Sequence, residues 1–172
     1  MNIVMEIYIL RHGAAEEATQ GMRDADRALT PDGAAKLQSV LRRARGAGAE
    51  PSIILTSPLR RARETAEIAA KSLRGESTLV ESRALAPESS PPEVWEEIRT
   101  HKTEAQLMIV GHEPLFSSVY AYLLGAPAVQ IDVKKGSLGR IDVDRMAGQP
   151  RGVLRWLLYP KLAADTGALI QR

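Results

Sequence analysis

The chain of 172 residues contains no cysteine, which excludes disulfide bonds, thiolate metal ligands and a cysteine nucleophile. Aromatic residues make up only 4% of the chain, so few rings are present on which nucleic-acid bases could stack. No apolar run approaches the roughly 18 residues that a transmembrane helix requires. We therefore expect a protein that binds neither nucleic acid nor a membrane.

Residues 1–10 lack the basic start and the small-residue cleavage site of a signal peptide, so a cytoplasmic protein is expected. The net charge is only +2, and the arginine clusters at 42–45 and 60–63 do not form the continuous basic stripe of a nucleic-acid surface. The length and the 44% hydrophobic content fit one domain over residues 1–172, with residues 161–172 as a surface tail. Composition gives no indication of oligomeric state.

Apolar periodicity predicts strands and helices in alternation. The expected strands are residues 3–10, 52–56, 78–81 and 105–111; the expected helices begin after Thr30, at Ser57-Pro58, at Ser90-Pro91-Pro92 and at residue 115. Residues 129–133 and 138–143 read as a hairpin around Lys134-Lys-Gly136, and residues 153–159 as a last strand. This order predicts an α/β fold: a three-layer α/β/α sandwich with a mostly parallel central sheet and antiparallel additions near the C-terminus.

Three of the predicted strands end in residues that suit an anion. The first ends in Arg11, His12 and Gly13, the fourth ends before His112, and the second is followed by residues 57–61 at the start of a helix. Because the carboxyl ends of parallel strands meet at one edge of a sheet, we expect these groups to converge. Arginines, histidines and a helix N-terminus without a carboxylate suit a doubly charged tetrahedral anion.

The residues between these motifs are less informative. Residues 14–28 are aperiodic and are expected to form a loop over the site, in which Arg23 and Arg27 either reach the anion or remain solvated. His101, in the last turn of a helix, is expected to be structural. No cluster of His, Asp and Glu shows the spacing of metal ligands, so we expect neither a metal nor a cofactor.

The motifs Leu10–Gly13, Thr56–Ala66 and Val110–Pro114, in this order and spacing, resemble those of the histidine phosphatase superfamily, also called the phosphoglycerate mutase-like superfamily. The short chain, Asp26–Pro31 and Lys134–Leu138 resemble its SixA phosphohistidine phosphatase branch. The resemblance covers nearly the whole chain, to about residue 160.

This resemblance implies a role for each matching residue. His12 would be the nucleophile that carries the phosphoryl group as a phosphohistidine intermediate. Arg11 and Arg61 would bind phosphoryl oxygens, and His112 would donate a hydrogen bond to an equatorial oxygen in the transition state. Arg60, the neighbour of Arg61, would point outward. The residues expected to bind substrate are Gly13, Arg27 and Ser57.

One departure from the family affects the substrate. Mutases and larger phosphatases of the family carry a leaving-group glutamate in the loop after the third strand, where Leu85-Ala-Pro87 has proline. Glu88 and Glu81 are nearby carboxylates that could replace it, although neither matches the motif. An alkoxide leaves with difficulty without an acid, whereas a phosphoramidate leaves as neutral imidazole once its ring nitrogen is protonated. The departure therefore favours phosphohistidine and aryl phosphates over sugar phosphates.

The expected activity is that of a metal-independent protein phosphohistidine phosphatase, with a phosphorylated protein or a small phosphate ester as its partner. One alternative is a small-molecule phosphomonoesterase that acts on aryl or sugar phosphates; a mutase would need covering insertions for which the chain is too short. A second alternative is a phosphate- or phosphopeptide-binding module without turnover. Such a module needs only cations to hold phosphate. It does not need a nucleophilic imidazole, so the presence of His12 argues against this alternative.

Overall fold

The computed structural model describes residues 4–144 and 148–164. Its strands are β1 (Val4–Arg11), β2 (Ile53–Thr56), β3 (Thr78–Glu81), β4 (Gln106–Gly111), β5 (Leu138–Asp144) and β6 (Val153–Leu158). Its α-helices are α1 (Pro31–Gly46), α2 (Arg60–Ser72), α3 (Pro91–Thr100), α4 (Leu115–Leu123) and α5 (Pro160–Ala163), and single 3₁₀ turns lie at Asp24–Asp26 and Arg83–Leu85. None of these helices is long and apolar enough to cross a membrane.

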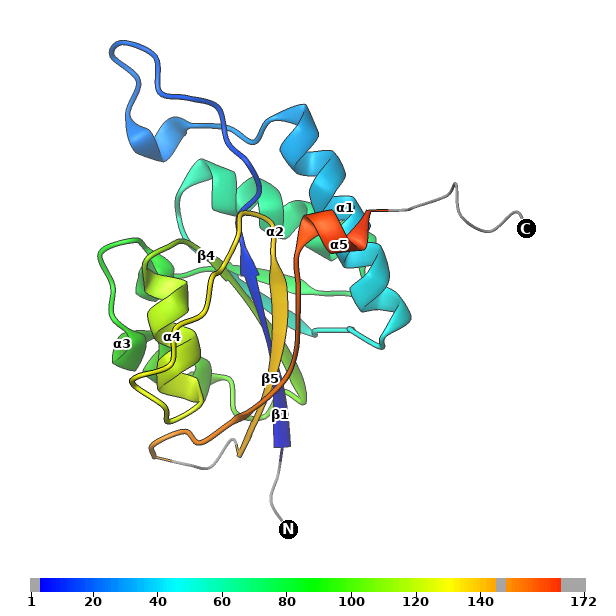
Figure 1. Cartoon of the computed structure of the whole chain (residues 1–172), viewed down its shortest axis with the longest axis vertical. Coiled ribbons are helices and arrows are strands. Elements are labelled where there is room, and N and C mark those ends of the chain that lie inside the picture. Colours follow the sequence, from blue (N-terminus) through cyan, green and yellow to red (C-terminus); the bar gives the residue numbers. More distant parts are fainter. Residues whose placement is uncertain (1–3, 145–147, 165–172) are drawn as a thin grey trace, which may run out of the picture.

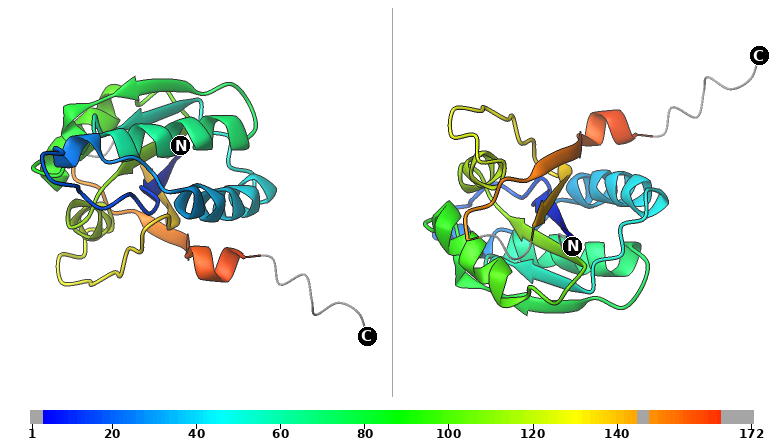
Figure 2. Two further views of the ribbon diagram at one scale, coloured as in Figure 1. Left: turned by 90° about the horizontal axis from the view of Figure 1, so that it is seen from above. Right: turned by 90° about the horizontal axis from the view of Figure 1, so that it is seen from below.

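The strands of this part of the chain form one sheet in the order β3-β2-β4-β1-β5-β6. The pairs β3–β2, β2–β4 and β4–β1 are parallel, whereas β5 is antiparallel to β1 and β6 is antiparallel to β5. Helices α1, α2 and α5 pack on one face, and α3 and α4 on the other (Figures 1 and 2). The predicted three-layer α/β sandwich with antiparallel additions near the C-terminus is confirmed.

The two faces of the sheet explain the near-continuous apolar runs in β1, β2 and β4. Side chains alternate between the faces of a strand, so Ile7 and Ile9 of β1 join the core under α3 and α4. Tyr8 and Leu10 join the core under α1 and α2. All four are at most 1% exposed. A strand buried on both faces is typical of a parallel sheet covered by helices.

Three of the four predicted helix starts are confirmed, including the start of α4 at Leu115. Thr30 caps α1 by accepting a hydrogen bond from the Gly33 N–H (2.9 Å), and Ser90 forms a capping box with Glu93 at the start of α3. The prediction that Ser57-Pro58 caps the second helix is wrong, because α2 begins at Arg60. The Ser57 hydroxyl is engaged with a histidine ring instead, as described below.

The predicted hairpin of residues 129–133 and 138–143 is also wrong. Residues 129–133 form no strand, and β5 is already paired with β1 on one side and β6 on the other, so neither edge is left for them. The turn at 134–136 does not connect two strands of a hairpin; it packs beside the end of β1. The Gly136 N–H donates to the carbonyl oxygens of Arg11 (3.2 Å) and His12 (3.0 Å), which fixes this turn beside the end of β1.

Part of the segment predicted as a surface tail, residues 161–172, is helical. Pro160–Ala163 form the short helix α5 beside α1 (Figure 1), and Ala163 is only 1% exposed. The remainder of the predicted tail, residues 165–172, lies outside the described residues. The sequence expectation failed here because a four-residue helix has too few positions to show a period.

Candidate active site

The register of the sheet brings the ends of β1, β2 and β4 side by side. The His12 N–H donates to the Gly111 carbonyl oxygen and the Ser57 N–H donates to the Val110 carbonyl oxygen, both at 3.0 Å, so the ladder continues one residue beyond the strands. The rings of His12 and His112 consequently lie next to each other, with centroids 5.0 Å apart and planes inclined by 54°. The expected convergence of the strand ends is present.

His12 is held as a neutral ring with a free lone pair. Its Nδ1 lies 2.7 Å from the Gly13 carbonyl oxygen, which can only accept, so the proton is on Nδ1. The Nε2 lone pair accepts a hydrogen bond from the Arg61 Nε–H (3.3 Å). Burial lowers the pKa of His12 to about 4. The hydrogen bond with Gly13 raises this pKa, whereas the charges of Arg61, Arg11 and Lys135 lower it further. At neutral pH the His12 ring is therefore uncharged, which is the form that can act as a nucleophile.

Arg61 is buried because of its position on α2. It is 5% exposed, and Thr65, one turn later on the same face, is fully buried. The Thr65 hydroxyl donates to the Arg61 carbonyl oxygen (2.7 Å) and accepts from the Gly13 N–H (3.2 Å), which joins α2 to the loop after β1. Arg60, the preceding residue, points to solvent and pairs with Glu64 (2.8 Å). The orientation expected of the two arginines is therefore observed.

His112 and Ser57 form a buried pair. His112 is 2% exposed and Ser57 is completely buried, and His112 Nε2 lies 2.7 Å from the Ser57 hydroxyl oxygen. That oxygen also accepts from the Leu59 N–H (3.3 Å) and keeps a second lone pair and its own proton, so the direction of its bond with Nε2 follows the tautomer of the ring. Nδ1 is buried and has no hydrogen-bond partner among the described residues. Burial lowers the pKa of His112 to about 3, with smaller contributions from His12 and the two site arginines.

Arg11 is anchored by the segment that precedes β5. Its Nη1 donates to the Val133 carbonyl oxygen (2.6 Å), while its Nε is buried without a hydrogen-bond partner in the part of the chain that the structure describes. Burial lowers the pKa of Arg11, and the carboxylates of Glu113 and Asp132 oppose this. A guanidinium stays charged throughout the physiological range, so Arg11 is a fixed cation beside His12.

Gly13 has a packing role. A Cβ there would lie 2.8 Å from Leu37 Cδ1 and 3.2 Å from the Gly33 carbonyl oxygen, so only glycine fits between the site and α1. The Gly13 N–H is already donated to Thr65. The sequence expected Gly13 to bind substrate; in the structure, the contacts of its backbone hold the loop after β1 in place.

The loop at 14–28 reaches the site through Asp24, which sequence reasoning missed. The Arg61 guanidinium donates from Nη1 to the Asp24 carbonyl oxygen (2.9 Å) and from Nη2 to its carboxylate (3.0 Å). The other carboxylate oxygen lies 3.3 Å from Nε of Arg27. Asp24 thus joins Arg27, an expected substrate-binding residue, to Arg61. Figure 1 shows this loop rising beyond the ends of the parallel strands. No periodicity marks Asp24 in the sequence, because a loop contact depends on the path of the chain.

The two carboxylates expected as possible acids lie outside this cluster. Glu81, at the end of β3, and Glu88 are both exposed. Within the described ranges, neither forms a hydrogen bond or ion pair with His12, His112 or Arg61. In these ranges there is also no group of three or more His, Cys, Asp or Glu side chains that could hold a metal ion.

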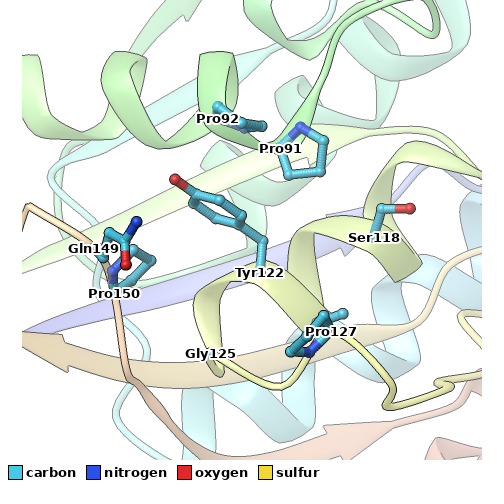
Figure 3. A pocket seen from close by; sticks show the side chains of 9 residues that line it. Pro91, Pro92, Ser118, Tyr122, Gly125, Pro127, Gln149 and Pro150 are labelled. Atoms are coloured by element: carbon cyan, nitrogen blue, oxygen red, sulfur yellow. The ribbon is translucent and has the colours of Figure 1, made fainter.

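Two cavities lie near the strands and helices that carry this cluster. One, of about 800 Å³, is lined by Arg11 and Gly13 and continues over α1, the turn at 134–136 and α5. The other, of about 430 Å³, lies between α3 and α4 and is lined by Tyr122 and several prolines (Figure 3). The second cavity includes none of the residues of the cluster, so only the first is continuous with the site.

The sequence and the fold both have known counterparts. The sequence model of the histidine phosphatase superfamily (branch 1) matches residues 7–86, which include Arg11, His12 and Arg61. The chain is also similar to an uncharacterized protein from Picosynechococcus sp. The two are 36% identical over 137 residues, which cover 78% of this chain and 82% of that protein.

Solved structures share the whole architecture. The structure of the protein histidine phosphatase SixA complexed with tungstate has a TM-score of 0.81 at 23% identity, and the match covers 91% of this chain and 98% of that one. A chain assigned as the phosphohistidine phosphatase SixA from Agrobacterium tumefaciens has a TM-score of 0.77 at 23% identity, over 91% and 98%. Phosphoserine phosphatase from Entamoeba histolytica, in complex with 3-phosphoglyceric acid, reaches 0.66 at 16% identity, over 90% and 97%. These TM-scores establish the fold; two of the three proteins are named for a phosphorylated histidine and the third for phosphoserine.

Proposed function

The chain belongs to the histidine phosphatase superfamily, and from this premise we propose that it is a phosphatase that removes phosphoryl groups from phosphohistidine residues of proteins. His12 is the proposed nucleophile. Arg11, Arg61 and His112 are the proposed phosphoryl-binding residues. Ser57 orients His112, and Asp24 and Arg27 hold the loop that covers Arg61.

The observation that carries this proposal is the state of His12. Its Nδ1 proton is committed to the Gly13 carbonyl oxygen, which leaves the Nε2 lone pair against the Arg61 guanidinium in a buried, cationic site. Nε of Arg11 and Nδ1 of His112, both buried, have no hydrogen-bond partner within the described residues. A tetrahedral dianion placed against Nε2 of His12 would supply an acceptor for the Arg11 Nε–H, and for Nδ1 of His112 in the tautomer that carries its proton there. A site that only binds phosphate would gain nothing from a ring held with its lone pair toward the anion.

The proposed reaction has two displacements. In the first, His12 Nε2 attacks the phosphorus atom, and the bond from phosphorus to the substrate nitrogen breaks as that imidazole takes a proton from solvent. In the second, water attacks the phosphorus of phosphorylated His12, which releases inorganic phosphate and a proton and restores the ring. Arg11, Arg61 and His112 stabilise the equatorial oxygens in both steps.

Phosphohistidine is favoured as the substrate because proline stands where larger members of the family carry their acid. The loop after β3 approaches the end of β4, since a Cβ on Gly111 would lie 3.3 Å from the Leu85 carbonyl oxygen. Pro87 follows in this loop, where larger members of the family are expected to carry their glutamate. An imidazole leaving group is protonated by solvent near neutral pH, whereas an alkoxide needs a positioned acid.

Phosphate release tests this proposal. A phosphohistidine protein, 4-nitrophenyl phosphate and a sugar phosphate are compared as substrates, with His12→Ala as the control. Phosphohistidine should be hydrolysed fastest, and His12→Ala should be inactive on all three. A rapid-quench experiment should trap one acid-labile phosphoryl group on His12. Fastest turnover of the sugar phosphate would instead indicate a small-molecule phosphomonoesterase and would make Glu88 and Glu81 the next positions to substitute. Phosphate binding without turnover would identify a binding module.

Metal independence is a separate part of the proposal. The charge that the transition state needs is supplied by Arg11 and Arg61, so a divalent cation would have no task at the phosphoryl group. Dialysis against a chelator should leave the rate of 4-nitrophenyl phosphate hydrolysis unchanged. Loss of activity that is restored by a specific metal would contradict this part.

A further inference from the structure

A basic cavity of about 800 Å³ adjoins the active site. We propose that it binds an acidic side chain of the phosphorylated protein, close in sequence to the phosphohistidine. This inference rests on the proposed function, because it identifies which phosphoproteins that site accepts.

The charged residues that line this cavity have one sign. Its lining comes from the loop after β1, from α1, from the turn at 134–136 and from the region of α5. The cationic lining residues are Arg11, Lys36, Lys134, Lys135 and Lys161, and no Asp or Glu is among the described residues that line it. The remaining lining is small or apolar, with Gly13, Ala14, Gly33, Ser39, Gly136, Tyr159, Pro160 and Ala164. Such a surface attracts a carboxylate and gives its methylene groups an apolar wall.

The four lysines differ in their present partners. Lys36 pairs with Asp32 (2.7 Å) and Lys134 pairs with Asp132 (2.6 Å), so part of their charge is already balanced. Lys135 and Lys161 form no ion pair with any described residue. Lys135 also acts electrostatically on the ring of His12, which places its charge near the catalytic centre. Lys135 and Lys161 are therefore the two cations available to an incoming anion.

The position of the cavity relates it to the phosphoryl group. Arg11 belongs to the catalytic cluster and also lines the cavity, as does Gly13 next to His12, so residues that flank a phosphohistidine bound at His12 would have the cavity within reach. The turn at 134–136 is fixed to the end of β1 by the Gly136 N–H, which keeps the backbone of Lys135 beside the site. The cavity volume exceeds what one phosphoryl group fills and lies within the usual range of ligand sites.

The exposure of the lysines favours a protein side chain over a second small anion. In the catalytic cluster the anion-binding Arg61 is 5% exposed and fixed by Asp24, which suits one rigid phosphoryl group. Around the cavity the charges are on long, flexible lysines; the Lys36 and Lys134 side chains are each 59% exposed. Flexible surface cations accommodate carboxylates at variable positions along a peptide and give selectivity by complementary charge.

The test compares three phosphohistidine peptides that differ only in the residues flanking the phosphohistidine: glutamate, glutamine or lysine. For the wild-type protein we expect kcat/KM to be about tenfold higher with glutamate than with glutamine, mainly through KM, and lowest with lysine. This preference should fall as ionic strength rises from about 20 mM to about 500 mM. In Lys135→Ala and Lys161→Ala the ratio of glutamate to glutamine peptide should fall by about threefold each. Lys71→Ala, an exposed lysine of α2 far from the cavity lining, should keep the wild-type ratio.

The outcomes separate this inference from the proposed function. Turnover of all three peptides at equal rates, or a ratio that the two lysine variants do not change, would overturn the inference and leave the proposed function intact. No turnover of any phosphohistidine peptide, with hydrolysis of 4-nitrophenyl phosphate retained, would overturn the proposed function and this inference together. A preference for an aryl phosphate that carries a carboxylate, without one for the glutamate peptide, would assign the cavity to a small dianionic ester and would also overturn the inference.

Discussion

Each side chain of the active site is fixed by a contact to the backbone or to one specific neighbour. His12 is oriented by the Gly13 carbonyl oxygen, His112 by the Ser57 hydroxyl, and Arg11 by the Val133 carbonyl oxygen. Side chains fixed in this way need little reorganisation when charge develops on a phosphoryl group. The donors that remain, above all the buried Arg11 Nε, are therefore already in place for substrate.

Arg61 and its neighbour Arg60 allow a matched test of this arrangement. In Arg61→Lys the planar fork that contacts both His12 and Asp24 is lost, because lysine has one point charge and cannot make the same contacts. We expect kcat for 4-nitrophenyl phosphate to fall by about 100-fold, a typical cost for removal of one transition-state donor.

The control is Arg60→Lys, which changes an exposed residue whose partner is Glu64. Its kcat should stay within about twofold of the wild-type value, since an exposed ion pair contributes little. Equal losses in the two variants would show that general basicity at the start of α2, and not the position of Arg61, supports the reaction.

At the scale of elements, α1 supports the loop that follows the catalytic histidine. Thr30 at its N-terminus donates its hydroxyl to the Ala14 carbonyl oxygen (3.3 Å), and the Thr30 N–H donates to the same oxygen (2.9 Å). Gly33, in the first turn, leaves room for this loop: a Cβ there would lie 2.4 Å from the Ala14 carbonyl oxygen. The start of α1 and the loop after β1 therefore act as one unit.

Substitution of the two terminal glycines of α1 tests this unit. Gly33→Ala forces the Ala14 backbone to move, so we expect the free energy of unfolding to fall by about 2 kcal/mol, together with a loss of kcat. Gly46→Ala, at the other end of the same helix, meets no atom within 4 Å and should be neutral or slightly stabilising. Urea denaturation measures the free energy of unfolding of each variant. Equal stability of the two variants would contradict the close contact between Gly33 and the Ala14 backbone.

Much of the element order could be predicted from the sequence, for local physical reasons. A strand buried on both faces is a continuous apolar run, and helix caps such as Thr30 act within four residues. The failures concern residues whose partners are distant. Residues 129–133 alternate like a strand, but β5 has no edge left for them. Ser57 looks like a helix cap, but its hydroxyl is bonded to His112, 55 residues away in sequence.

At the scale of the whole molecule, the parallel sheet makes the site predictable. Three strand ends meet at one edge, so the convergence of His12, His112 and the start of α2 follows from the chain order alone. The bond from Asp24 to Arg61 and the wall of lysines from the turn at 134–136 to α5 do not follow from it. They depend on the path of loops and of a very short helix, which no sequence period records.

The two buried histidines should also make the whole fold sensitive to acid. Their pKa values are lowered to about 4 for His12 and about 3 for His112, whereas an unfolded histidine titrates near 6.5. Below about pH 6.5 the unfolded chain therefore binds protons that the folded chain does not, so the free energy of unfolding falls as pH decreases. This loss of unfolding free energy begins near pH 6.5 and grows as pH falls, until the rings of the folded protein are themselves protonated near pH 4 and pH 3.

The double variant His12→Asn, His112→Gln removes both rings and isolates this effect from the titration of carboxylates. Relative to the double variant, the wild-type protein should lose about 4 kcal/mol of unfolding free energy between pH 8 and pH 5, on the order expected for two protons taken up only by the unfolded chain. Urea denaturation at the two pH values measures this difference, and NMR of the ring protons should show that neither histidine titrates in this interval. A parallel decline in both proteins, or a ring midpoint near 6.5, would mean that the histidines are charged in the folded state. In that case His12 would not be a resting nucleophile at mildly acidic pH.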